Sequence, residues 1–196
     1  MRRMVFLVVA ALAAGAASAF PEVKAECWIE SRQALKRVFM EREYGVRPVE
    51  RPSDLRFETS PDAEILGGKA VRREVKLSMT GPRGPFSFTA VAYLPKGVKE
   101  VASFVYIYLY RTATVVESFD RRAEDPSTRS FPVADIIRRG YAAVAFVNAE
   151  VALDWREKCF SSGVFAAWGP GPEPSDRKGS DWGAISAWAW GASRVL

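Results

Sequence analysis

The chain has 196 residues, of which 48% are apolar, 26% charged and 12% aromatic, and this balance excludes disordered, collagen-like and coiled-coil proteins. The length suits a single domain or part of a larger one. The 28 Lys and Arg residues exceed the 23 Asp and Glu residues by only five and form no long basic block, so no nucleic-acid partner is expected. The sequence contains no histidine, which excludes a Ser-His-Asp or Cys-His apparatus and a His-ligated zinc site in this chain acting alone.

Residues 1–19 have the organisation of a secretory signal peptide. Two arginines precede an apolar stretch over residues 5–14, and Ala17, Ser18 and Ala19 form a small-residue cleavage site. We therefore expect a mature domain over residues 20–196 that is secreted or periplasmic. The apolar stretch is shorter than the about 20 residues that span a bilayer, so no membrane association is expected after signal removal, although an uncleaved anchor is the alternative.

Export would place the two cysteines, Cys27 and Cys159, in an oxidising compartment, where they could form a disulfide. Two isolated thiols are an equally good interpretation, because a disulfide requires Cα atoms within about 7 Å of each other. Neither cysteine has a metal-binding spacing, and we expect no metal and no cofactor.

The first half of the mature chain predicts a helix followed by a hairpin. Apolar residues recur at helical spacing over residues 28–43, where they define one face, and Gly45 ends the helix. Apolar and polar residues alternate over residues 72–80 and again over residues 86–94, as in half-buried strands. Glycine and proline between them, over residues 81–85, predict the turn of an antiparallel pair.

The second half predicts a parallel unit. Residues 101–110 and 141–147 are nearly all apolar, which is typical of strands buried on both faces. Residues 132–139 between them predict a short helix that ends at Gly140. Strand, helix and strand form a βαβ crossover, so the fold class is α/β.

The end of the chain predicts a long loop and a buried helix. The stretch after Val147 looks irregular, and its glycine- and proline-rich part, residues 163–179, predicts a functional loop. Residues 182–196 are rich in alanine and tryptophan and predict a buried helix with Ser180 or Asp181 as its N-cap.

The segment WGAISAWAWGASR, residues 182–194, resembles the helix motif of the glucuronoyl esterases. These 4-O-methyl-glucuronoyl methylesterases are carbohydrate esterases of the α/β-hydrolase fold, which cleave the ester between lignin and the 4-O-methylglucuronic acid of xylan. Residues 28–45, 67–70 and 137–141 support the resemblance. It covers most of the mature chain but only the first half of such an esterase.

The resemblance implies the N-terminal half of an α/β-hydrolase: an N-terminal helix, an antiparallel hairpin and a parallel βαβ unit, in a three-layer sandwich left incomplete. The family's nucleophile, acidic residue and histidine would lie beyond Leu196, so no catalytic residue is assigned and the chain alone is expected to be inactive. The loop that lends a backbone N–H to the oxyanion hole would fall at Tyr110, Arg111 and Thr112. The third strand, residues 101–110, would keep a bare hydrogen-bonding edge, which predicts poor solubility or a complementing chain.

Two further candidates for chemistry have plain structural alternatives. Ser193 stands in Gly-Ala-Ser-Arg, but Val195 replaces the second glycine of a nucleophile elbow and the preceding run is helical. A serine on a helix surface is the better interpretation. Glu150 and Asp154 could act as an acid/base pair only if they share a cleft, and the default interpretation is that both are solvated surface acids. Leu153 stands where the family has a proline between its acidic residues.

Several aromatic residues could stack on sugars, although core packing is their commoner role: Trp155, Trp168, Tyr106, Tyr108 and Tyr110. The implied substrate is glucuronoxylan or a lignin–carbohydrate ester. The alternative function is a non-catalytic exported module that binds carbohydrate or a partner chain.

Overall fold

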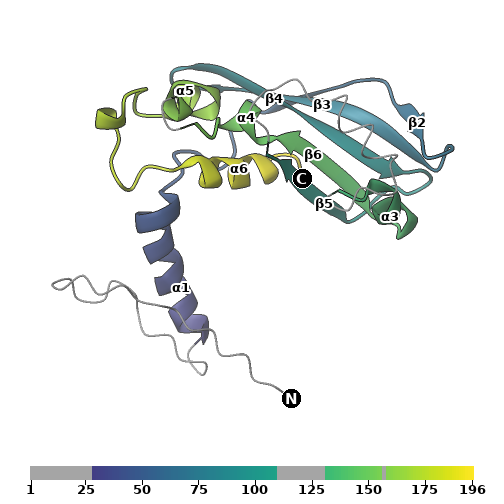
Figure 1. Cartoon of the computed structure of the whole chain (residues 1–196), viewed down its shortest axis with the longest axis horizontal. Coiled ribbons are helices and arrows are strands. Elements are labelled where there is room, and N and C mark those ends of the chain that lie inside the picture. The colour runs from purple at the N-terminus through teal and green to yellow at the C-terminus, as the bar shows by residue number, and fades with distance from the viewer. Residues whose placement is uncertain (1–27, 110–130, 156–157) are drawn as a thin grey trace.

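The computed structural model describes residues 28–109, 131–155 and 158–196, so the expected signal peptide lies outside the described residues. A six-stranded mixed sheet forms the centre of the molecule (Figure 1). Its strands lie in the order β1-β3-β4-β6-β5, and β2 also pairs with β3. The strands are β1 (Arg56–Thr59), β2 (Ala63–Ile65), β3 (Ala70–Gly81), β4 (Gly84–Pro95), β5 (Ser103–Tyr108) and β6 (Ala142–Val147).

The predicted antiparallel hairpin is confirmed, because β3 pairs with β4 along the whole length of both strands. Both strands are longer than the ranges over which apolar and polar residues alternate. Gly81 pairs directly with Gly84, so the turn consists of Pro82 and Arg83 alone. Gly81 lies against the helix α5 (Gly163–Trp168), where a Cβ atom would be 2.4 Å from the Ala167 carbonyl oxygen. Arg83 donates to that oxygen through its backbone N–H at 3.1 Å and to the Pro170 carbonyl through its guanidinium at 2.8 Å. The turn therefore satisfies carbonyl groups at the C-terminal end of α5.

The predicted βαβ crossover is confirmed. The helix α3 (Val133–Arg138) connects β5 to β6, and the two strands are parallel. All six residues of β6 are buried, as predicted, but β5 is not buried on both faces. Phe104 of β5 is 55% exposed. The expectation is wrong for β5 because this strand is the last one on its side of the sheet.

Helices cover both faces of the sheet and give three layers. One face packs Leu77, Phe88 and Phe146 against α5 and against the helix α6 (Ala184–Ala192). The other face packs Tyr93 against α3 and Phe131. No helix among the residues that the structure describes has the length and apolar character required to cross a membrane.

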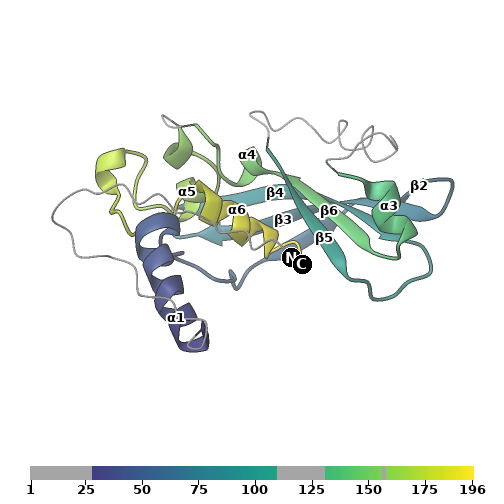
Figure 2. The same ribbon diagram turned by 60° about the horizontal axis from the view of Figure 1, so that its bottom comes forward.

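The N-terminal helix forms as predicted, but its apolar face is not covered by the described chain. The helix α1 (Trp28–Phe39) continues into a π-helical turn, η2 (Met40–Tyr44), and ends at Gly45. It projects away from the sheet in both views (Figures 1 and 2). Its C-terminal end is fixed to the body, because Gly183 N–H donates to the Tyr44 carbonyl at 3.1 Å and Val46 N–H to that of Ser180 at 2.8 Å.

The stretch after Val147 is less irregular than predicted. It contains α4 (Asn148–Val151), α5 and the short 3-10 turns η3 (Cys159–Ser161) and η4 (Pro174–Asp176). The helix α5 forms within the expected loop because Val164 and Phe165 are buried against the sheet. The N-cap expectation for α6 is wrong: Gly183 occupies that position, and the Asp181 carboxylate instead accepts the backbone N–H of Lys178 at 2.7 Å.

Candidate functional site

The carboxyl ends of the parallel strands β5 and β6 are the first place to look for a functional site. In open α/β sheets ligands bind outside these ends. The strand β6 leads there into α4, and β5 leads through Leu109 into residues 110–130. The predicted oxyanion-hole donors Tyr110, Arg111 and Thr112 follow at once but lie outside the described residues, so their role stays a prediction.

The Glu150 carboxylate accepts a backbone hydrogen bond from β4 just beyond the last paired residues of β4 and β6. The pairing of β4 with β6 runs as far as Ala90 and Phe146, and beyond it the Thr89 N–H donates to the Glu150 carboxylate at 2.7 Å. Asp154 lies elsewhere, in a shallow hollow of about 330 Å³ that Glu43, Ser186 and Trp188 also line and Glu150 does not. The two carboxylates do not share that hollow, and the geometry does not favour their acting as an acid/base pair.

Burial raises the pKa of Glu150, and the Thr89 N–H only partly opposes that shift. The folded chain then holds this proton more tightly than the unfolded chain, so stability falls as pH rises from the ordinary glutamate value through the raised pKa. We expect Glu150→Gln to remove this loss, so that the stability of the variant relative to the parent increases from pH 4 to pH 8. Urea denaturation at each pH measures the difference. Curves that stay parallel over this range would contradict the assignment.

The tryptophans of the motif in residues 182–194 hold α6 in place. Trp190 is fully buried, and its indole N–H donates to the Glu50 carbonyl at 2.9 Å. The Trp188 indole donates to the Ala152 carbonyl at 2.8 Å, and the ring of Trp182 meets that of Trp190 edge to face at 6.0 Å. The motif therefore positions a helix rather than a ligand.

Ser193 lies at the C-terminal end of α6 and not on a strand-to-helix turn. Its hydroxyl donates to the Trp190 carbonyl at 2.8 Å and receives a hydrogen bond from the Arg194 guanidinium at 3.1 Å. None of its partners in the described part of the chain is a base that could accept its proton, so this hydroxyl is not activated as a nucleophile.

Most of the candidate sugar-stacking rings pack in the interior. Tyr108 is buried, the ring of Tyr106 stacks on Phe131 at 4.8 Å, and Trp168 packs against Phe86 and Trp190. Trp155 is exposed, with the Lys158 ammonium 5.2 Å from its ring centre. Of the four candidate rings that the structure describes, Trp155 has the ring that is exposed to solvent. The fifth candidate, Tyr110, lies outside the described residues.

The proposed disulfide cannot be located, because Cys27 lies outside the described residues. Cys159 is buried, and burial raises the pKa of its thiol, which lowers the thiolate fraction. Among the described residues no three or more His, Cys, Asp or Glu side chains gather in a way that could hold a metal ion.

The strand β5 ends the sheet on the side opposite β1. It pairs with β6 along its whole length, and it is the terminal strand of the order, so its other edge has no strand beside it within the described chain. The helix α6 contacts β5, and the C-terminus lies beside this strand in both views (Figures 1 and 2). As far as the structure describes the chain, this edge of β5 is therefore open, and it lies beside the C-terminal end of α6.

Comparison with known proteins identifies the architecture. No protein-family model and no curated protein matches the sequence. Among solved structures, the chain is similar to a CE15 glucuronoyl esterase from Teredinibacter turnerae, with 25% identity and a TM-score of 0.64 over 88% of this chain and 42% of the other. It is also similar in fold to a glucuronoyl esterase from Solibacter usitatus, with 22% identity and a TM-score of 0.61 over 88% and 48%. The chain thus spans less than half the length of these proteins.

Proposed function

We propose that this chain, which is a partial glucuronoyl esterase-like protein of the α/β class, is the part of an exported carboxylic ester hydrolase that precedes the nucleophile. It builds the first strands of the sheet and the helix that leads to the next strand. Hydrolysis then depends on groups outside these 196 residues. The substrate class is a glucuronoyl ester, which the names of the similar structures support. The resemblance of residues 182–194 to the family's helix motif extends this to esters of glucuronoxylan or of a lignin–carbohydrate linkage.

The observation that carries the proposal is the open edge of β5. A strand leaves unpaired N–H and C=O groups at such an edge. Parallel strands are joined through crossover helices, and α6 follows β6 and contacts β5. A chain that continued from α6 would reach this edge and could form a further parallel strand there. The nucleophile would come with that added part, because the 196 residues contain no histidine and Ser193 is bonded within its helix.

Export is part of the proposal and rests on the pattern of residues 1–19. A secreted or periplasmic location would suit a polysaccharide substrate. The second candidate is a non-catalytic exported module that binds carbohydrate or a partner chain, and the exposed ring of Trp155 favours it.

Ester hydrolysis tests the proposal. Residues 20–196 are assayed on methyl glucuronate and on an aryl acetate, beside a version extended through the coding sequence that follows residue 196. We expect activity in the extended protein alone. Activity in residues 20–196 that is lost in Ser193→Ala or Glu150→Ala would contradict the proposal, and inactivity of both proteins would favour the binding module.

The open edge also predicts self-association. Phe104→Lys places a charge on β5, which discourages pairing with another copy, and we expect it to shift residues 20–196 toward monomer in analytical ultracentrifugation. Phe57→Lys is the matched control, because Phe57 is 48% exposed on β1 at the opposite edge. That strand is short and already carries Arg56 and Glu58, so the control is expected to behave like the parent. Equal behaviour of all three proteins would contradict association through β5.

A further inference from the structure

Three arginines gather beside the C-terminal end of α6. Arg194 follows the helix, and its guanidinium carbon lies 5.8 Å from the ring centre of Trp190. The Trp190 indole N–H donates to the Glu50 carbonyl at 2.9 Å, which brings Arg51 to the same place. The Arg47 guanidinium bonds the Glu50 carboxylate, also at 2.9 Å. All three of these charged side chains interact electrostatically with Arg194, so we call the three arginines and Glu50 the arginine cluster.

The arginine cluster carries an excess of positive charge. Glu50 is its one carboxylate, and the Glu50 side chain is 73% exposed and already paired with Arg47. Within the described part of the chain neither Arg51 nor Arg194 forms an ion pair. The carbonyl groups at the end of a helix favour a nearby cation but supply only about half a negative charge. The cluster can therefore accept a further carboxylate.

Arg194 also has a buried donor without an acceptor. Its Nε atom is buried and has no hydrogen-bond partner among the described residues, whereas its Nη2 atom donates to the Ser193 hydroxyl at 3.1 Å. Burial and then the charge of Arg51 lower the pKa of Arg194. This guanidinium has lost water without gaining a full set of acceptors, which costs stability. A carboxylate would recover that stability through two parallel hydrogen bonds.

The crossover geometry places the arginine cluster beside the next strand. The helix α3 connects β5 to β6 on one face of the sheet, and α6 lies on the other face. Crossovers between parallel strands are right-handed. A crossover on the opposite face therefore leads the chain in the opposite direction, from β6 past β5. The C-terminal end of α6, where Arg194 lies, is beside β5 in both views (Figures 1 and 2).

We infer that the arginine cluster is a contact surface for the part of the hydrolase that adds to β5, and that an Asp or Glu of that part binds the Arg194 guanidinium. The inference rests on the proposed function, because that part of the protein is what the proposal adds. A carboxylate suits this position better than a hydroxyl or a carbonyl. A neutral acceptor would satisfy Nε but would leave the excess charge of Arg51 and Arg194 in place.

Arg194→Met tests the inference, because it keeps the length of the aliphatic stem and removes every donor. In residues 20–196 the change removes an unpaired buried donor, so the urea midpoint should stay unchanged or rise. In the extended protein the same change removes a charged hydrogen bond, and the midpoint should fall by about 0.5 M. Arg194→Lys keeps the charge and should retain part of the stability. Equal effects of Arg194→Met in the two proteins would overturn the inference.

A control and an activity assay separate this inference from the proposed function. Arg56→Met removes an arginine of β1, at the opposite edge of the sheet, and should affect both proteins equally. Ester hydrolysis is measured on the same extended protein. If that protein is active but loses no stability through Arg194→Met, the inference is wrong and the proposed function stands. If it is inactive but does lose stability, the contact is supported and the proposed function is wrong.

A second measurement needs residues 20–196 alone, with Phe104→Lys as the background to keep the β5 edge unpaired. Sodium succinate supplies a free carboxylate, and binding to the folded chain raises its melting temperature. We expect a higher melting temperature in succinate than in sodium chloride of equal ionic strength. The difference should disappear in Arg194→Met and persist in Arg56→Met. No difference between the two salts, or a difference that Arg194→Met leaves intact, would overturn the inference.

Discussion

Replacing Trp190 with alanine is expected to lower the free energy of unfolding by about 3–5 kcal/mol, which is typical for a buried tryptophan. The side chain is fully buried. Its ring meets Trp182 at 6.0 Å and Trp168 at 5.9 Å, and its indole N–H donates to the Glu50 carbonyl. The substitution opens a cavity among these rings and leaves a carbonyl without its donor. Urea denaturation of residues 20–196, followed by far-UV circular dichroism, measures the loss.

Two variants separate the parts of this effect. Trp190→Phe keeps a ring but removes the indole donor, and we expect an intermediate loss. Ile185→Ala changes the same helix at a position that is 59% exposed, and it should cost less than about 1 kcal/mol. A loss in Trp190→Ala no larger than that in Ile185→Ala would contradict the role of Trp190 in fixing α6 to the sheet.

Gly45→Ala is expected to lower the free energy of unfolding by about 2–4 kcal/mol or to detach α1 from the body. Gly45 has φ +74° and ψ 168°, a backbone conformation that is almost confined to glycine. A Cβ atom there would also lie 2.2 Å from the Asp181 carbonyl oxygen. The backbone would have to move, which would disturb the hydrogen bonds of Tyr44 and Val46 with the segment before α6.

Gly97→Ala is the matched control for this substitution. Gly97 also has a positive φ, +79°, but no atom within 4 Å of an added Cβ, so alanine there shows the cost of a positive φ, about 1–2 kcal/mol, without the collision. We expect Gly45→Ala to lose clearly more than Gly97→Ala in urea denaturation. Limited proteolysis after Gly45→Ala should also cut more rapidly near residue 45. Equal losses in the two variants would show that the close approach to Asp181 is unimportant.

The elements that were predicted most accurately from the sequence are those in which burial of one or both faces produces a regular pattern of apolar residues. Leu77 and Met79 alternate with Ser78 and Thr80 because β3 has one buried face, and β6 is continuously apolar because both its faces are buried. The strand β1 was missed because its single apolar residue, Phe57, is half exposed and leaves no pattern. The helix α5 was missed because neighbouring glycines and prolines hide a helix that tertiary burial stabilises.

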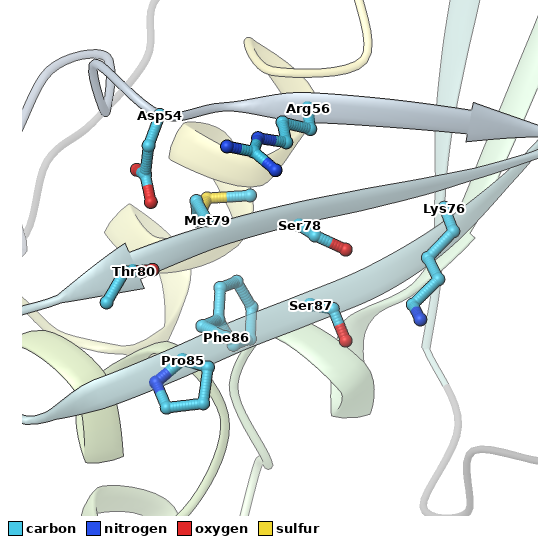
Figure 3. A pocket seen from close by; sticks show the side chains of 9 residues that line it. All are labelled: Asp54, Arg56, Lys76, Ser78, Met79, Thr80, Pro85, Phe86 and Ser87. Atoms are coloured by element: carbon cyan, nitrogen blue, oxygen red, sulfur yellow. The ribbon is translucent and has the colours of Figure 1, made fainter.

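The candidate sites were predictable to different degrees. The lack of histidine excluded a triad in these residues without any structure, and the helical character of the segment before Ser193 argued against an elbow. The hollow that Arg56, Ser78 and Ser87 help to line (Figure 3) was not predictable, because strand pairing brings these residues together. That pairing requires β1, which the sequence pattern does not indicate. The separation of Glu150 from Asp154 likewise depends on how α4 meets β4.

Hydrogen exchange along β5 tests most directly whether the outer edge of this strand is unpaired in residues 20–196 and pairs with a further strand in the extended protein. In residues 20–196 at a concentration where the chain is monomeric, every second amide of β5, the set that does not face β6, should exchange much faster than the amides of β6. In the extended protein the same amides should become protected. Uniform protection of β5 in the monomeric short chain would contradict the account, because it would mean that the edge is already covered.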